Sequence, residues 1–195
     1  MSLPPPDQER QWLLQAQRER DPQAFARLVA RHQGRVRAVL RQLTHGHTAL
    51  ADELAQETFL QAWRALPNFR HDAQWSTCLY RIAYREFLQH RRQQFVGGSV
   101  AYSDEWDSTA TEPTTEPDHE MRLDLTRALA QLHPQETASI VLCYHAGLSH
   151  TQAAEVLGLP LGTLKSHLMR GRAKLQVLLA AWSPVEAARP QRSPT

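Results

Sequence analysis

The chain has 195 residues, with 22 cationic and 20 acidic side chains and a formal net charge of +2. This length suits one large domain or two small ones. No apolar run is long enough to span a bilayer, and residues 1–6 lead directly into the polar segment DQER, which excludes a membrane helix and a signal peptide and predicts a cytoplasmic protein.

The spacing of cysteine and histidine predicts neither a metal site nor a cofactor. Cys78 and Cys143 stand alone in their segments, no Cys/His pattern of a zinc site is present, and we predict that both cysteines are buried thiols. A polar turn explains His45 and His47 better than a metal site does, because a metal ion needs further converging ligands.

Composition and charge predict an all-α fold of two small helical domains joined by a flexible acidic linker. Gly is rare, with 8 residues, and no segment alternates apolar and polar residues as a strand does. Residues 1–92 carry 14 cations and 9 acids, residues 93–120 carry 7 acids and no cation, and residues 121–195 carry 8 cations and 4 acids. We therefore place the domains at 1–92 and 120–182, the linker at 93–119 and a disordered tail at 183–195. Basic blocks suit nucleic acid, which repels an acidic linker.

The N-terminal block begins with a short predicted helix over residues 7–20, and a stronger helix follows. Asp21 as cap and Pro22 as first residue start this second helix. Its apolar residues recur at helical spacing as far as Leu43, and its arginines are most simply a solvated face.

The helix predicted over residues 48–66 has an unusual outward side. Its apolar residues cover one broad side, whereas Leu60 stands on the other. Around it lie Glu53, Gln56, Glu57, Gln61 and Arg64. A Leu in such a ring is a candidate anchor for a protein contact, although an exposed Leu alone carries little information.

The next segment combines a polar loop with a basic helix. On this helix Arg81, Arg85 and Arg92 share a face away from the apolar residues, and that face suits a phosphate backbone. Trp75, at the junction, is a candidate either for the loop surface or for the core.

The C-terminal block ends in a predicted helix-turn-helix. Two helices come first, one from about residue 118 and one that begins at Pro134. Ser149 and Gln152 have the spacing of a capping box, which starts the next helix, and residues 158–160 separate it from a last helix.

The last helix has an apolar stripe and a polar side. Leu161, Leu164, Leu168, Gly171, Leu175, Leu178 and Leu179 form the stripe. The candidate DNA-binding residues are Thr163, Ser166, Arg170 and Lys174 opposite it, with Lys165 and His167 on the shoulders. Short polar side chains near the start of such a helix would meet base edges in the major groove, and the cations would meet phosphates. An ordinary amphipathic hairpin with a solvated basic face is the alternative.

Several stretches resemble bacterial sigma factors of the extracytoplasmic-function (ECF) type. Residues 147–175 are similar to their promoter-reading helix-turn-helix, in which GLS, A-E-x-L-G and GT-x-KS recur. ADELAQETFLQAW, residues 51–63, resembles the helix that clasps the coiled coil of the polymerase's largest subunit. F-R-x-D-A at 69–73 and L-Y-R-I-A at 79–83 resemble the promoter-melting loop and the helix behind it.

This resemblance implies a dissociable specificity subunit that reads the −10 and −35 promoter elements, assists strand opening and performs no chemistry itself. Its implied partners are core RNA polymerase, double-stranded promoter DNA, the melted non-template strand and an anti-sigma factor, without membrane insertion. The implied polymerase-binding residues are Glu53, Gln56, Glu57, Leu60 and Arg64. The implied DNA-binding residues of the N-terminal loop and helix are Asn68, Phe69, Arg70, His71, Asp72, Trp75, Arg81 and Arg85.

The chain departs from the family's pattern at several positions. Cys78 stands where Trp is usual, Arg85 where Asn is common and Gln89 where Asp is common. Ala138 and Cys143 occupy positions where Arg is frequent. These departures concern base choice, support of the loop, and backbone contacts from the helix before the helix-turn-helix.

Two other functions compete with this interpretation. A stand-alone helix-turn-helix regulator of the LuxR type has a related pattern, but it leaves residues 48–66 and the F-R-x-D-A loop without a role. For an enzyme, His71 with Asp72 or His150 with its neighbours are conceivable groups, yet no nucleophile, base and orienting residue form a set, and no phosphate loop is legible.

Overall fold

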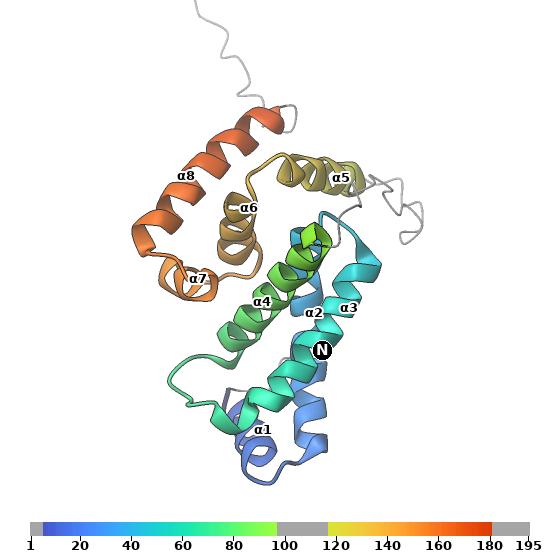
Figure 1. Cartoon of the computed structure of the whole chain (residues 1–195), viewed down its shortest axis with the longest axis vertical. Coiled ribbons are helices and arrows are strands. Elements are labelled where there is room, and N and C mark those ends of the chain that lie inside the picture. Colours follow the sequence, from blue (N-terminus) through green and yellow to red (C-terminus); the bar gives the residue numbers. More distant parts are fainter. Residues whose placement is uncertain (1–5, 97–116, 181–195) are drawn as a thin grey trace, which may run out of the picture.

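The computed structural model describes residues 6–96 and 117–180, and every regular element within these ranges is helical, which confirms the all-α class (Figure 1). The N-terminal half comprises α1 (Pro6–Arg18), α2 (Pro22–Leu43), α3 (Thr48–Ala65), the 3-10 turn η1 (Leu66–Asn68) and α4 (Trp75–Val96). The C-terminal half comprises α5 (Pro117–Ala130), α6 (Pro134–Ile140), the π-helical turn η3 (Val141–His145), α7 (His150–Leu157) and α8 (Leu161–Leu178).

In the N-terminal half, α2, α3 and α4 pack on one another, and α1 packs on α2. Asp21 begins α2 as predicted: its side chain accepts a hydrogen bond from the Gln23 N–H at 2.8 Å, and Pro22 is the first helical residue. Leu40 and Leu79 are among the fully buried side chains of this half. Burial of one such leucine contributes about 2 kcal/mol relative to exposure.

The C-terminal half contains the predicted helix-turn-helix, α7 and α8. Ser149 and Gln152 form the capping box at the start of α7, and Gly158, with φ +65, ends it. Both α6 and α7 pack against α8. Gly171 lies at the α6 contact, where a Cβ would come within 2.6 Å of the Ile140 Cδ1 atom, so the missing side chain permits the close approach.

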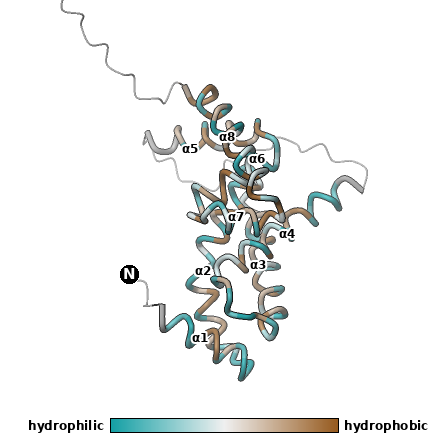
Figure 2. Tube along the Cα trace, turned by 90° about the vertical axis from the view of Figure 1, so that its left-hand side faces the viewer, coloured by the Kyte–Doolittle hydropathy of each residue, from teal (hydrophilic) through white to brown (hydrophobic). Residues whose placement is uncertain are grey.

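The two halves touch through their helices. α7 packs against α4, and η3 packs against α2. The buried apolar residues of both halves form one cluster, and Figure 2 shows hydrophobic and hydrophilic residues alternating along the helices. The predicted tail and most of the predicted linker lie outside the described residues. Helix α4 continues to Val96, past the predicted limit at residue 92, and the domain limits stay predictions.

Some predictions for single residues are wrong. Leu161 and Leu178 are 40% and 39% exposed, because the covered part of α8 is its middle, between Leu164 and Gly171. Cys78 and Cys143 are only half-buried, yet this burial still raises the pKa of both thiols. The helix predicted to begin at Pro134 does begin there, which confirms that prediction, and it becomes π-helical at Val141.

Candidate polymerase-binding and nucleic-acid-binding surfaces

The outward face of α3 carries the predicted polymerase-binding residues together. Leu60 is 53% exposed at the centre of this face. The face is completed by exposed Glu53, Gln56 and Arg64 and by half-buried Glu57. Gln61 donates a hydrogen bond to the Glu57 carboxylate at 2.6 Å, and Arg64 lies 3.9 Å from the same oxygen. These contacts arrange charged groups around an apolar centre.

The loop between α3 and α4 surrounds a cavity of about 590 Å³. Its wall includes Asn68, Phe69, Arg70, Asp72, Ala73, Trp75, Cys78 and Arg81. Most of the predicted strand-binding residues are therefore brought together. Glu155, from α7 in the other half, also lines this cavity. Sequence patterns gave no reason to connect Glu155 with the loop.

Helix α1 holds this loop in place. The Gln17 side-chain amide donates hydrogen bonds to the carbonyl oxygens of Phe69 at 2.8 Å and Pro67 at 3.2 Å. Its oxygen lies 2.6 Å from the Nε2 atom of His71, which adopts a left-handed backbone with φ 57. His71 thus faces α1 rather than the cavity wall. Gln17 is a supporting residue that the sequence did not reveal.

Trp75 belongs to both the core and the cavity. Its side chain is 3% exposed, and its ring meets the Phe69 ring edge-on at 5.1 Å between centres. The indole N–H of Trp75 has no hydrogen-bond partner among the described residues. Arg85 does not line the cavity: it lies farther along α4, 3.4 Å from the Glu86 carboxylate. The residues that line the loop cavity and the Arg85 side chain therefore belong to separate surfaces.

The outer face of α8 differs from the predicted one. Thr163 and Lys165 are exposed, and the Ser166 hydroxyl donates to the Gly162 carbonyl oxygen at 3.0 Å. His167, predicted for a DNA-facing shoulder, is only 7% exposed because its position borders the buried stripe. Burial, and then the charge of Arg170, lower its pKa. Met169 is 69% exposed on the outer face, and the sequence-based set omitted it.

The two later cations of α8 contact a buried carboxylate. Glu136 of α6 is 3% exposed, its Oε2 atom lies 2.7 Å from Lys174 Nζ, and its Oε1 atom lies 3.4 Å from Arg170 Nε. Burial alone would raise the pKa of Glu136, but hydrogen bonds from Lys174 and the His133 N–H, with both cations, hold it below its usual value. Arg170 and Lys174 are therefore partly neutralised within the protein.

Comparison with known proteins follows the same division into halves. The family model described as "Sigma-70 region 2" matches residues 28–95, and the family model described as "Sigma-70, region 4" matches residues 122–175. The RNA polymerase sigma factor CnrH of Cupriavidus metallidurans is 35% identical over 168 residues, covering 81% of this chain and 87% of that protein. The chain belongs to the sigma-70 family of RNA polymerase sigma factors. NccH of Alcaligenes xylosoxydans xylosoxydans is 32% identical over 166 residues, covering 82% of this chain and 88% of that protein.

Solved structures of sigma factors have the same fold. CnrH in complex with the cytosolic domain of CnrY superposes with a TM-score of 0.67 at 28% identity, covering 90% of this chain and 99% of that chain. RpoE in complex with the anti-sigma factor NepR from Bartonella quintana gives 0.68 at 26% identity, covering 80% and 96%. These matches confirm the two helical domains. The ECF RNA polymerase sigma factor SigM of Mycobacterium tuberculosis, 32% identical over 170 residues and covering 86% of this chain and 83% of that protein, confirms the ECF resemblance.

As a sigma factor, the protein directs promoter-specific transcription initiation. The match over residues 28–95 disfavours the alternative of a stand-alone helix-turn-helix regulator, because such a regulator has no use for a sigma region 2. Helix α1 precedes that match, although it supports the loop within it. No helix in the part of the chain that the structure describes is both long and apolar enough to cross a bilayer.

Proposed function

We propose that this sigma factor divides its work among the three surfaces described above. The α3 face binds core RNA polymerase, the loop cavity takes the melted non-template strand of the −10 element, and α8 reads the −35 element as a duplex. The observation that carries this proposal is the loop cavity, where aromatic, amide and cationic side chains from residues 68–81 converge.

The polymerase-binding assignment rests on Leu60. A large apolar side chain that is half exposed and ringed by charged and amide groups has the anatomy of an interface anchor with a polar rim. The opposite side of α3 is committed to the core through residues such as Leu54 and Phe59. Only the Leu60 face of this helix is thus free for a partner.

The strand-binding assignment rests on the chemistry of the cavity wall. Phe69 offers an aromatic face for stacking, and Arg70 and Arg81 offer charge for phosphates. The indole N–H of Trp75 is a buried donor without a partner among the described residues, and such a group gains stability when a base supplies an acceptor. A flipped base therefore finds both stacking and hydrogen-bonding groups here.

The duplex-reading assignment concerns the outer face of α8. Thr163, Lys165 and Ser166 lie near its start, where side chains reach base edges in the major groove. Met169 adds an exposed apolar group of the kind that contacts a thymine methyl. Arg170 and Lys174 would reach phosphates by exchanging or sharing their contact with Glu136. His167 no longer belongs to this set.

We further infer that the protein is not an enzyme and works in the cytoplasm, with the polymerase making the bonds. The two sigma factors of similar structure are bound to CnrY and to the anti-sigma factor NepR. An anti-sigma factor is accordingly proposed as a partner of this chain. Its predicted role is to withhold the chain from polymerase.

Transcription of a genomic library by purified core polymerase, with and without this protein, tests the proposal. New start sites that share two spaced sequence elements are expected only when the protein is present. In a binding titration with core polymerase, Leu60→Arg should reduce the affinity at least about tenfold, because a charge replaces the apolar anchor. Leu178→Arg, an exposed leucine outside the α3 face, is the matched control. Unchanged affinity for the Leu60 variant would remove the α3 assignment.

A further inference from the structure

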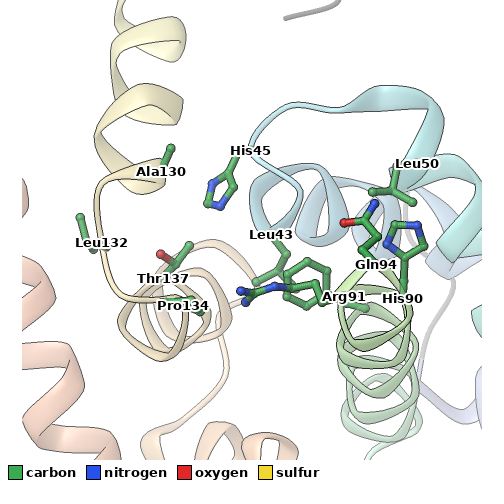
Figure 3. A pocket seen from close by; sticks show the side chains of 11 residues that line it. Leu43, His45, Leu50, His90, Arg91, Gln94, Ala130, Leu132, Pro134 and Thr137 are labelled. Atoms are coloured by element: carbon green, nitrogen blue, oxygen red, sulfur yellow. The ribbon is translucent and has the colours of Figure 1, made fainter. Parts of the chain in front are cut away.

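A second cavity, of about 340 Å³, lies where the two halves meet. One wall is the turn after α2 that carries His45, and another is the last part of α4 with His90 and Arg91. The third wall is the connection between α5 and α6 around Leu132 and Pro134 (Figure 3). The cavity exists in this form only while the halves are packed together.

The polar lining of this cavity is cationic or neutral, and none of its lining residues is acidic. Arg91 extends from α4 into the space, and His45 points into it from the turn (Figure 3). The Arg91 guanidinium lies 5.8 Å from the centre of the Phe87 ring. No ion pair joins Arg91 to a carboxylate among the described residues. Within residues 6–96 and 117–180, the Arg91 charge in this cavity therefore has no carboxylate counter-charge.

Asp52 of α3 and Glu136 of α6 are already paired with cations away from this cavity. Asp52 of α3 lies 3.4 Å from Arg37, and Glu136 of α6 lies 2.7 Å from Lys174. Burial, and then the charge of Arg91, lower the pKa of His45. An anion placed between Arg91 and His45 would reduce the repulsion between them and favour the protonated imidazole.

The backbone also presents His45 to this space. His45 has φ 52 and Gly46 has φ 90, so the turn is left-handed at two successive positions. A positive φ is uncommon for a residue with a side chain, and here it belongs to the C-terminal cap of α2, where the Gly46 N–H donates to the Arg41 carbonyl oxygen at 2.8 Å. The turn places an imidazole, rather than a small polar residue, at the cavity.

We propose that this cavity binds a small phosphorylated molecule, with its phosphate between Arg91 and His45 and its organic part against the apolar wall. Arginine and protonated histidine donate charge-assisted hydrogen bonds to phosphate oxygens. Leu43 and Leu132 supply apolar surface. The volume is near the lower end of ligand pockets, about 300–1,000 Å³, and it is too small for a nucleic-acid duplex.

Occupancy would stabilise the packed arrangement of the two halves, because the walls come from both. A ligand that binds one arrangement better than another shifts the population toward it. The inference goes beyond promoter recognition: it adds a small-molecule signal to a DNA-reading protein. Its test does not depend on the sigma-factor assignments, which transcription examines separately.

Isothermal titration calorimetry on the full chain tests the site, with inorganic phosphate and ribose 5-phosphate as probes and ribose as the uncharged control. Chloride keeps the ionic strength constant. We expect one saturable site for each phosphate and no binding of ribose. Arg91→Gln and His45→Asn should each weaken binding at least about tenfold. Asn is chosen because it tolerates positive φ.

Arg92→Gln is the matched control, since Arg92 is an exposed neighbour on α4 that does not line the cavity. It should change phosphate affinity less than about twofold, whereas Arg91→Lys should retain part of the affinity because it keeps the charge. Circular dichroism and the thermal midpoint establish that each variant is folded. Equal losses in Arg91→Gln and Arg92→Gln would overturn the site, because they would indicate diffuse charge.

Hydrogen exchange gives a second readout at the contact between α4 and α7. Saturating phosphate should slow amide exchange in both helices of the unmodified chain and leave the Arg91→Gln variant unchanged. Exchange that does not respond to bound phosphate would overturn the proposed coupling between ligand and packing. For promoter DNA we expect the opposite result: Arg92→Gln weakens DNA binding, whereas Arg91→Gln does not.

Discussion

The loop cavity and the outer face of α8 hold their cations in different ways. Arg70 and Arg81 line the loop cavity without an ion pair to any carboxylate among the described residues. Arg170 and Lys174, in contrast, contact the buried carboxylate of Glu136. A cation that is already paired gains less from a phosphate, because it must give up or share its partner. The two surfaces should therefore respond differently to salt and to mutation.

Glu136→Gln should have the largest effect, because it removes the buried charge that ties α6 to α8. We expect a loss of stability of about 2 kcal/mol, below the value for a fully buried pair because Arg170 and Lys174 are half exposed. Urea unfolding measures this loss. Affinity for promoter duplex should rise several-fold, with a salt slope steeper by up to about 1 for each freed cation.

Asp124→Asn is the control for that experiment. Asp124 lies 3.2 Å from Arg127 in an exposed pair, and its loss should cost at most about 0.5 kcal/mol. If Glu136→Gln lowers DNA affinity with no change in salt slope, Glu136 only positions α8, and the contrast between the two surfaces disappears.

Phe69→Ala should reduce capture of the melted strand by about tenfold, because base stacking on an aromatic side chain contributes about 1–3 kcal/mol. Open-complex formation by the reconstituted polymerase, on a promoter found in the library experiment, measures the effect. Tyr144→Ala removes an aromatic side chain that is 58% exposed on η3 and should leave strand capture unchanged. Equal defects in the two variants would argue against stacking in the cavity.

Arg81→Ala should lower the slope of DNA affinity against salt by about 1, because Arg81 has no ion pair among the described residues. Arg85→Ala should lower it less, since Arg85 lies 3.4 Å from the Glu86 carboxylate and outside the cavity. Affinity measured over a series of salt concentrations distinguishes the two. If the two variants have identical salt slopes, a position in the loop cavity does not affect how strongly an arginine contributes to DNA binding.

The smallest expected effect is a pH dependence from His167. Its pKa is lowered from 6.5 in the folded chain, so at pH values just below 6.5 the unfolded chain binds a proton that the folded chain does not. Stability should thus be full above pH 6.5 and decline as the pH falls below it. The thermal midpoint between pH 7.5 and pH 5.5 measures this decline, and His167→Gln should reduce it. If the thermal midpoint of the His167→Gln variant depends on pH in the same way as that of the unmodified chain, His167 is not the cause.

Much of the fold follows from local sequence. The cap at Asp21, the capping box of Ser149 and Gln152, and the stop at Gly158 depend on neighbouring residues, and all three are present. The exposure of Leu60 follows from helical spacing alone, because the opposite side of α3 is apolar except for Thr58. These features need no knowledge of the tertiary structure.

The remaining features arise from contacts between distant segments. Gln17 reaches the carbonyl oxygen of Phe69, and Glu136 reaches Lys174, across separations of 52 and 38 residues, which no local pattern encodes. His167 is an intermediate case. It lies three positions after Leu164 and four before Gly171, so helical spacing predicts that it borders the buried stripe. How far its side chain is buried depends on how closely α6 approaches α8.

The position of Glu155 gives the molecule an order of events. A polyanionic strand that approaches the loop cavity meets a carboxylate contributed by α7, and like charges at short range oppose its entry. While α7 packs on α4, Glu155 borders the loop cavity and belongs to the half of the chain that we propose reads the duplex. Under the proposed function, separation of α7 from α4 would take the Glu155 carboxylate away from the cavity, and we expect promoter recognition and entry of single-stranded DNA to be consecutive steps.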